Sequence, residues 1–373
     1  MRVLFAAGGT AGHINPALAI ADKLMEVFPK TEILFVGKPD GMEKRLVTKA
    51  GYNFCGVEMW GFERGFSLHS IKIDIKAAYC YLFSARRAVK KIIREFKPDL
   101  AVGTGGYVTA TVLKNAISMG IKTVAHESNS YPGMATKMLA GKADRILLAC
   151  EDAKKYLKTD KNCVVTGNPL RSNIPIEARS AARKRLGLDD GFTVLSFGGS
   201  LGANRITEAV AGLIAREQQI GGINHIHSYG NNNRELFYGA LEKNGVRENE
   251  RLTFKPYIDN MYTCMCAADL IISRAGAMTI TELTEIGRAA ILVPYPNAAE
   301  NHQYYNALTL QNARAAMIIE DKDLTSEKLI AVVEKLYNNR SRLAEMETNA
   351  KALRQENAVD KIISEIIEVM DLK

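Results

Sequence analysis

The sequence has few cysteines and no long apolar run. Its 373 residues include six cysteines, at 55, 80, 150, 163, 264 and 266, and none of them forms a C-x-x-C pair. This pattern favours reduced thiols in a cytosolic protein. No apolar run approaches the ~20 residues that a membrane-spanning helix needs. The apolar residues 3–7 run directly into glycines and are too few for a signal peptide, so they predict a first β-strand.

The sequence also lacks a metal-ligand cluster and a complete dinucleotide motif. His225 and His227 can share one face of a strand, but no third ligand accompanies them. We therefore expect a polar strand face there and no bound metal. A dinucleotide site needs G-x-G-x-x-G and an acidic residue at the end of the second strand. The second strand here ends in Gly37 and Lys38, which argues against a Rossmann dehydrogenase.

Two glycine-rich motifs are the most informative feature that is present. Gly8 to His13 follows the apolar residues 3–7, and Gly198 to Gly202 follows the apolar residues 194–197. A buried strand, a glycine-rich turn and a helix start together form a cradle for phosphate or sugar. Two copies in one chain predict two similar α/β halves that face each other across a cleft.

Apolar runs alternate with helical patterns along both halves, which predicts parallel sheets with helices on both faces. The expected strands are 2–7, 32–36, 100–103, 122–125, 145–149 and 163–166, then 192–197, 223–228, 251–254, 269–273, 290–293 and 316–319. The turn-forming residues 167–175 mark a domain boundary. A helix is expected over 75–96, and the final helix, 358–370, has an apolar stripe that suits a return onto the first domain.

Further polar segments follow expected strands, where ligands bind in open α/β sheets. The loop 273–279 opens a helix, so its amides can reach a phosphate, and Glu282 can accept both hydroxyls of a ribose. Residues 300–306 crowd amides and an imidazole that suit sugar hydroxyls, and residues 126–129 end another strand.

Basic residues are concentrated in one stretch. Residues 60–97 contain nine Lys or Arg and three Asp or Glu, a net charge of +6 out of +8 for the whole chain. Aliphatic and aromatic side chains interleave with these cations, which suits an anionic membrane surface better than nucleic acid. The alternative is a buried helix with a solvated basic face.

Several ordered motifs together resemble the MurG family of bacterial peptidoglycan glycosyltransferases. They are GGTAGHINPALA at 8–19, GTGGYVT at 103–109, HESN at 126–129, GNPLR at 167–171, GGSLGANRI at 198–206, SRAGAMTITE at 273–282 and ENHQYYNA at 300–307. The resemblance covers essentially the whole chain at matching spacing. Ala11 stands where some members have glycine, and His302 where some have glutamine.

The resemblance implies a GT-B fold, in which two Rossmann-like α/β domains with parallel sheets face a central cleft. It assigns acceptor and membrane binding to residues 1–167, with a C-terminal helix at about 355–373 packed back on them, and UDP-sugar donor binding to residues 168–354. The implied reaction is an inverting transfer of N-acetylglucosamine from UDP-N-acetylglucosamine to the C4 hydroxyl of undecaprenyl-diphospho-N-acetylmuramoyl-pentapeptide. It implies no cofactor, no metal and no nucleic acid, and a peripheral protein at the cytoplasmic face of the bacterial cell membrane.

The site residues of the family carry over to matching positions. The implied donor-binding residues are Thr10, Ala11, Gly12, Asn129, Arg171, Ser200, Ile258, Ala277, Met278, Thr279, Glu282 and Gln303. Among these, residues 277–279 and Ser200 would hold the diphosphate, the backbone of Ile258 would contact uracil, and Glu282 would bind the ribose. The implied acceptor-binding residues are Gly9, Gly105, Gly106 and Tyr107.

An inverting transfer also needs a general base for the acceptor hydroxyl. His13 is the first candidate, because an imidazole has an unperturbed pKa of ~6.5, and Glu127 is the second. Two other function classes stay open: a hydrolysing UDP-N-acetylglucosamine 2-epimerase, which needs no lipid acceptor, and a nonenzymatic UDP-sugar-binding module.

Overall fold

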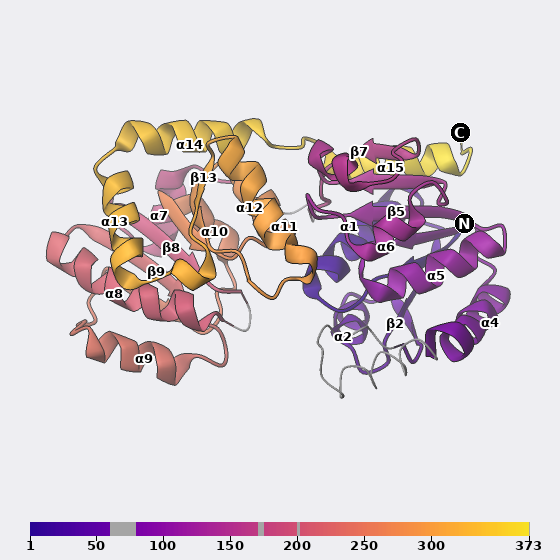
Figure 1. Ribbon diagram of the computed structural model, residues 1–373, viewed down its shortest axis with the longest axis horizontal. Coiled ribbons are helices and arrows are strands. Elements are labelled where there is room, and N and C mark those ends of the chain that lie inside the picture. The colour runs from indigo at the N-terminus through magenta and orange to yellow at the C-terminus, as the bar shows by residue number, and fades with distance from the viewer. Residues whose placement is uncertain (60–79, 171–174, 200–201, 373) are drawn as a thin grey trace. The chain divides into compact units, whose positions relative to one another are not determined.

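The computed structural model describes residues 1–59, 80–170, 175–199 and 202–372. Its contacts divide the chain into two compact units, Met1–Ser172 with Gln355–Lys373, and Asn173–Arg354 (Figure 1). Three sequence predictions fall wholly or partly outside the described residues: Ser200, Arg171 and the part of the basic stretch at 60–79.

The first unit contains a parallel sheet with the strand order β3-β2-β1-β4-β5-β6-β7. The strands are β1 Arg2–Ala6, β2 Glu32–Gly37, β3 Asn53–Gly56, β4 Leu100–Gly103, β5 Lys122–Glu127, β6 Arg145–Leu148 and β7 Cys163–Val165. The helices are α1 Ala11–Val27, α2 Met42–Lys49, α4 Arg86–Phe96, α5 Gly106–Ser118, α6 Met134–Leu139 and α15 Ala358–Val369, with a 3-10 helix η2 at Glu151–Tyr156.

The first unit has a hydrophobic core on each face of its sheet, and alternate side chains of β1 point into the two cores. Val3 and Phe5 are buried in one cluster, which also contains residues of α1 and α15. Leu4 and Ala6 are buried in the other, which also contains residues of α4 and α5. Successive side chains of a strand point to opposite faces, so a strand covered on both sides is apolar throughout.

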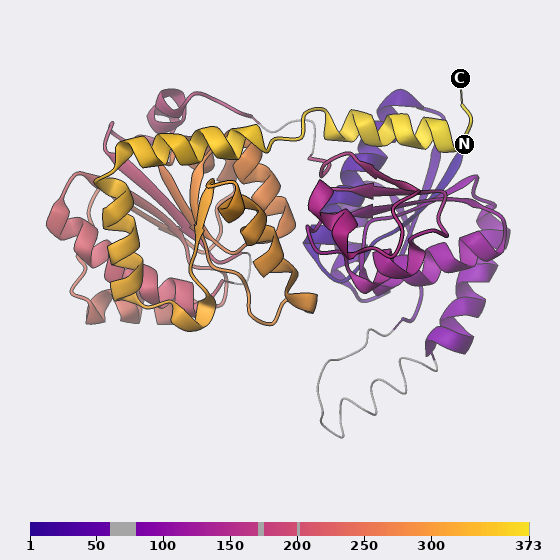
Figure 2. The same cartoon turned by 45° about the horizontal axis from the view of Figure 1, so that its top comes forward.

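The C-terminal helix α15 belongs to the first unit, although the second unit precedes it in the chain (Figure 2). Its apolar stripe, Ile362, Ile363, Ile366 and Val369, is buried in the cluster that contains α1. At its exposed side, Arg145 of β6 pairs with Glu365 at 3.0 Å and with Glu368 at 2.6 Å. The helix therefore completes the core of the first unit.

The helix expected over 75–96 differs from the structure in part. Residues 75–79 lie outside the described part of the chain, Cys80–Ala85 form a π-helix, and α4 begins at Arg86. α4 ends where Lys97 adopts a left-handed conformation, with φ of 49°. The strand β3 was not predicted, because its four residues show no apolar alternation and become a strand only by pairing with β2.

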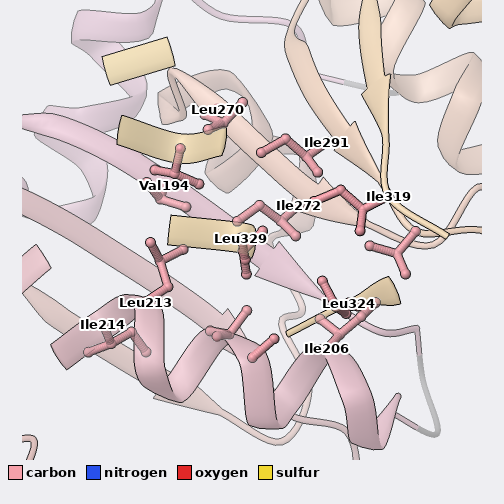
Figure 3. Packing of buried hydrophobic residues seen from close by; sticks show 14 of the residues in the cluster. Val194, Ile206, Leu213, Ile214, Leu270, Ile272, Ile291, Ile319, Leu324 and Leu329 are labelled. Atoms are coloured by element: carbon pink, nitrogen blue, oxygen red, sulfur yellow. The ribbon is translucent and has the colours of Figure 1, made fainter. Parts of the chain in front are cut away.

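The second unit contains a parallel sheet with the strand order β10-β9-β8-β11-β12-β13. The strands are β8 Phe192–Phe197, β9 Ile223–Ser228, β10 Leu252–Lys255, β11 Leu270–Ser273, β12 Ala289–Leu292 and β13 Ala316–Ile318. The helices are α7 Arg179–Leu186, α8 Asn204–Ile220, α9 Arg234–Lys243, α10 Met261–Ala267, α11 Ala277–Ile286, α12 His302–Asn312, α13 Ser326–Tyr337 and α14 Arg340–Ala352. Figure 3 shows side chains of β8, β11 and β12 packed against Leu213 of α8 and Leu329 of α13.

The expected polar face at His225 and His227 is in fact a buried network. Both imidazoles are fully buried, and Ser196 Oγ lies 2.7 Å from His225 Nε2 and 2.7 Å from His227 Nδ1. His225 Nδ1 lies 2.6 Å from the carboxylate of the buried Glu217 on α8. Burial and the neighbouring His225 lower the pKa of His227 to about 3, so this ring is neutral near pH 7. The network cross-links β8, β9 and α8.

Both sheets have the same internal order around their central strand. The strand order reverses between β1 and β4 in the first unit, and between β8 and β11 in the second. An aspartate marks the equivalent place in each: Asp99 Oδ2 accepts a hydrogen bond from Arg2 N at 2.7 Å, and Asp269 Oδ2 accepts one from Thr193 N at 2.8 Å. Ligands of open α/β sheets bind at the carboxyl ends of the strands where the order reverses.

Candidate functional site

The loops after β1 and β4 meet at the reversal point of the first sheet. Gly106 has φ of +78°, and a Cβ there would lie 2.5 Å from the carbonyl oxygen of Gly8. The backbones can approach this closely only because residue 106 is glycine. Thr104 Oγ1 donates a hydrogen bond to the carbonyl of His13 at 2.6 Å and ties the second loop to the start of α1. The predicted acceptor residues Gly9, Gly105, Gly106 and Tyr107 are therefore near neighbours of the first glycine motif.

His13 lies in the first turn of α1, directly beside the loop that follows β4. A Cβ added to Gly105, which has φ of +118°, would collide with the imidazole of His13. The ring thus packs against the bare backbone of residue 105. It is partly exposed. It also acts electrostatically on His126, whose pKa is lowered mainly by burial.

Glu127, at the end of β5, is a structural carboxylate. Its Oε1 accepts hydrogen bonds from the backbone and side-chain amides of Asn129, both at 3.0 Å. Its Oε2 accepts from Gly133 N at 2.9 Å and from Thr136 Oγ1 at 2.6 Å. Four donors, from Asn129, Gly133 and Thr136, thus occupy the oxygens of this buried carboxylate. Glu127 therefore orients Asn129 and fixes the loop between β5 and α6.

The second unit repeats the arrangement of loops around β8 and β11. Gly202 has φ of +86°, and a Cβ there would lie 2.5 Å from the carbonyl oxygen of Tyr229, so the loop can close onto β9 only with glycine. After β11, α11 begins at Ala277, and the amide of Ile280 is the one that bonds Gly276 O, at 3.0 Å. The amides of residues 277–279 come before this first intrahelical donor, which makes the helix start suited to an anion.

Polar side chains brace the loop that precedes α11. Gln303 Oε1 accepts hydrogen bonds from Ala275 N at 3.2 Å and from Tyr295 N at 2.9 Å. Asn306 Nδ2 donates to Ala275 O at 3.2 Å. The sequence predicts that this amide-rich segment binds sugar hydroxyls. In the structure, the side-chain oxygen of Gln303 instead accepts hydrogen bonds from two backbone amides.

Arg274 fixes the same loop from its other side. Its guanidinium pairs with Asp321 at 2.6 Å and donates to the carbonyl of Val293 at 3.2 Å. Asp321 in turn receives a hydrogen bond from Arg205 of α8 on its carbonyl oxygen, at 3.0 Å. Asp321 thereby links the first turn of α8 to the loop that follows β11. The sequence does not predict this role, because nothing local marks an aspartate after β13 as a partner of either segment.

Glu282 lies on α11, and Ile258 immediately precedes α10. The Tyr262 hydroxyl of α10 donates a hydrogen bond to Glu282 Oε1 at 3.1 Å. Burial raises the pKa of Glu282 to about 7, against the opposing effect of this hydrogen bond. The side chain of Ile258 is buried in the core, so its backbone is what remains for recognition.

The described residues contain no group of three or more His, Cys, Asp or Glu arranged to hold a metal ion. None of the described helices combines the length and the apolar character that crossing a membrane requires. The predicted site residues that the structure describes lie at or beyond the carboxyl ends of strands of their own unit, β1, β4 and β5 in the first and β10, β11 and β12 in the second. These positions offer main-chain amides, hydroxyls, the imidazole of His13 and the carboxylates of Glu127 and Glu282.

The chain matches known proteins over its full length. Residues 3–148 match the glycosyltransferase family 28 N-terminal domain, and residues 193–365 match the glycosyltransferase family 28 C-terminal domain. A relative from Acetivibrio thermocellus, named UDP-N-acetylglucosamine–N-acetylmuramyl-(pentapeptide) pyrophosphoryl-undecaprenol N-acetylglucosamine transferase, is 39% identical over 100% of this chain and 99% of its own. A relative of the same name from Desulforamulus reducens is 38% identical over 99% of both chains.

Solved structures agree with this similarity. MurG of Acinetobacter baumannii superposes with a TM-score of 0.76 at 28% identity, covering 98% of this chain and 99% of its own. The UDP-GlcNAc 2-epimerase of Neisseria meningitidis, bound to UDP-GlcNAc, has a TM-score of 0.63 at 13% identity, covering 99% of this chain and 100% of its own. At 13% identity, the similarity to the 2-epimerase shows a shared fold and nothing more.

Proposed function

Because the chain belongs to glycosyltransferase family 28 and its full-length relatives are named N-acetylglucosamine transferases, we propose the following reaction. The protein transfers N-acetylglucosamine from UDP-N-acetylglucosamine to undecaprenyl-diphospho-N-acetylmuramoyl-pentapeptide. The observation that carries this proposal is identity of 39% across the whole chain. The predicted family resemblance and the predicted GT-B-type fold of two parallel-sheet α/β domains are confirmed. The 2-epimerase alternative shares the fold at only 13% identity.

The second unit binds the donor in this proposal. The amides at the start of α11 hold the diphosphate, together with Ser200, and the positive end of the helix stabilises the charge on the departing UDP. Arg171, which belongs to the first unit, is the further residue proposed for the diphosphate. The backbone of Ile258 contacts the uracil, and Glu282 accepts the ribose hydroxyls. Gln303 reaches the sugar with its amide nitrogen, since its oxygen is occupied by backbone amides.

The first unit supplies the acceptor side and the base. The paired glycine loops receive the lipid diphosphate through their main-chain amides, and Thr10, Ala11, Gly12 and Asn129 contact the N-acetylglucosamine. His13 takes the proton from the C4 hydroxyl as that oxygen attacks C1 of the sugar. The bond between C1 and the UDP oxygen breaks, and UDP leaves with the electron pair, so the configuration at C1 inverts.

Product analysis tests the proposal directly. The full-length protein is incubated with UDP-N-acetylglucosamine, with and without a short-chain analogue of the lipid acceptor. We expect UDP and the glycosylated lipid in equal amounts when acceptor is present. N-acetylmannosamine appearing without acceptor would establish an epimerase instead, and binding of the UDP-sugar without any product would establish a nonenzymatic module.

The described part of the basic stretch supports a peripheral position on an anionic membrane. α4 buries Val89 and Ile93 in the first unit and exposes cations, among them Arg86, Arg87 and Lys91. Phe83, just before this helix, has 64% of its surface exposed. Cations beside an exposed aromatic side chain suit the headgroup region of a bilayer. We place this surface at the cytoplasmic face, where the lipid-linked acceptor is presented.

Charge reversal on this surface should weaken vesicle binding. Each cation near an anionic surface contributes ~1 kcal/mol, so changing Arg86, Arg87, Lys90 and Lys91 together to glutamate should lower the partition coefficient by at least about 10³-fold. Co-sedimentation with phosphatidylglycerol vesicles at low salt measures it. The matched control reverses four exposed lysines elsewhere on the same unit, Lys49, Lys142, Lys158 and Lys161. Equal loss in both variants would mean a response to net charge alone.

A further inference from the structure

One hydrogen bond joins two segments of the proposed donor site. Tyr262, in the first turn of α10, donates its hydroxyl proton to Glu282 Oε1 on α11, at 3.1 Å. In the described part of the chain, no other hydrogen bond and no ion pair reaches this carboxylate. α10 begins three residues after Ile258, so the proposed uracil contact and this tyrosine lie four residues apart in the chain.

We propose that Tyr262 is a positioning residue of the donor site, which orients the Glu282 carboxylate toward the ribose and favours its charged form. The inference rests on the proposed function, because it takes Glu282 as the ribose ligand. A ribose offers two hydroxyl donors, and an ionised carboxylate accepts from both. A protonated carboxyl carries a hydrogen on one oxygen and loses that acceptor. Donor binding therefore depends on the charge state of this group.

Burial and the Tyr262 hydrogen bond are the two effects that set the charge state of Glu282. The other ionisable groups on the helices that pack against α11 are Cys264 and Cys266 of α10, His302, Tyr304 and Tyr305 of α12, and Arg340, Arg342, Glu345, Glu347 and Lys351 of α14, followed by Arg354 just after α14. Arg354 is committed to Glu285 at 2.7 Å, and the His302 ring to a backbone carbonyl at 2.7 Å. None of these groups affects the pKa of the carboxylate, which burial raises to about 7 and the tyrosine hydroxyl lowers.

The affinity for the donor should therefore depend on pH, with the ionised carboxylate as the form that binds. A carboxyl with a pKa of about 7 is half protonated at neutral pH, so donor affinity should rise as pH increases through 7 and level off above it. Removing the hydroxyl raises the pKa further. If the midpoint moves up by about one unit, affinity at pH 7 falls about fivefold and recovers to about three quarters of its maximum by pH 8.5.

The experiment measures UDP-N-acetylglucosamine affinity of the full-length protein by calorimetry from pH 6 to 8.5, without acceptor. This ligand has no phosphate group that titrates in the range. The variants are Tyr262→Phe, Glu282→Gln and a control, Tyr238→Phe on α9, which removes a hydroxyl that makes no hydrogen bond in the described structure. We expect the Tyr262→Phe midpoint to move to higher pH, the control to follow the wild type, and Glu282→Gln to bind weakly without this pH dependence.

A Tyr262→Phe profile that superposes on the wild type, or that is weaker by one factor at every pH, would overturn the inference, since a merely structural residue would give that result. Recovery of affinity at pH 8.5 shows in the same titration that the variant is folded. Unchanged binding by Glu282→Gln would overturn the ribose assignment itself. A 2′,3′-dideoxyuridine analogue of the donor should bind without the pH dependence.

Discussion

Replacing His13 by glutamine should lower kcat by about 10²- to 10⁴-fold, the contribution of a well-placed general base, while leaving UDP-N-acetylglucosamine affinity nearly unchanged. The reason is that a general base acts in the chemical step, whereas the residues proposed to hold the UDP moiety, such as Glu282, belong to the second unit. Steady-state kinetics with saturating acceptor and calorimetry of donor binding separate the two quantities. Protonation of an imidazole base makes kcat fall at acid pH, and this fall should disappear in the variant as well.

A glycine variant tests the same imidazole without changing it. A Cβ at Gly105 collides with the His13 ring, so Gly105→Ala should reproduce much of the loss in kcat. Gly120→Ala is the matched control, because Gly120 also has a left-handed φ, +74°, but no atom within 4 Å of the added Cβ. Full turnover in the His13 variant would remove this residue from the chemistry and leave the base unassigned.

Replacing Asp269 by alanine should destabilise the protein by about 3–5 kcal/mol, because it leaves a buried guanidinium without its counter-charge. Asp269 accepts a hydrogen bond from Arg183 at 2.5 Å, and Arg183 is only 9% exposed. Arg179 also lies 3.3 Å from the same carboxylate. A loss of this size is a large part of the ordinary stability of a domain. Scanning calorimetry with urea denaturation followed by circular dichroism measures the change.

The other copy of the motif provides the control. Asp99 makes the same backbone hydrogen bond to the start of β1, at 2.7 Å, but it is exposed and has no buried arginine beside it. Asp99→Ala should therefore cost only about 0.5–1.5 kcal/mol, the net value of one hydrogen bond. Similar losses in the two variants would contradict the importance of the buried pair. Because the two units can unfold separately, each transition is followed on its own.

The sequence was sufficient for the elements and for the location of the loops. Strands such as β1 and β8 are mainly apolar, and the glycine motifs follow them directly, so both are local signals. β3 was missed because it is short, partly exposed and becomes a strand only by pairing with β2. The buried network around Ser196 was expected as a polar strand face, because alternation indicates which residues share a face but not what covers it.

The site followed the same division. Residue types and their position after strands predict that the glycine motifs and the 273–282 segment bind phosphate and ribose, and this stays a prediction. Glu127 was the second candidate for the base. Its four hydrogen bonds, two from residues six and nine positions away, could be known only from the fold of the loop. The partners Tyr262 and Asp321 carry no local signal at all.

The sequence alone determined the two α/β units, most of their strands, their glycine loops and the family to which the chain belongs. Each of these depends on apolar runs, turn-forming residues and motifs that extend over only a few neighbouring residues. The tertiary structure decided which side chains meet: Thr104 with His13, Tyr262 with Glu282 and Arg183 with Asp269. These contacts depend on the order of strands in each sheet. That order is set by the packing of apolar faces across the whole unit, so no short segment encodes it.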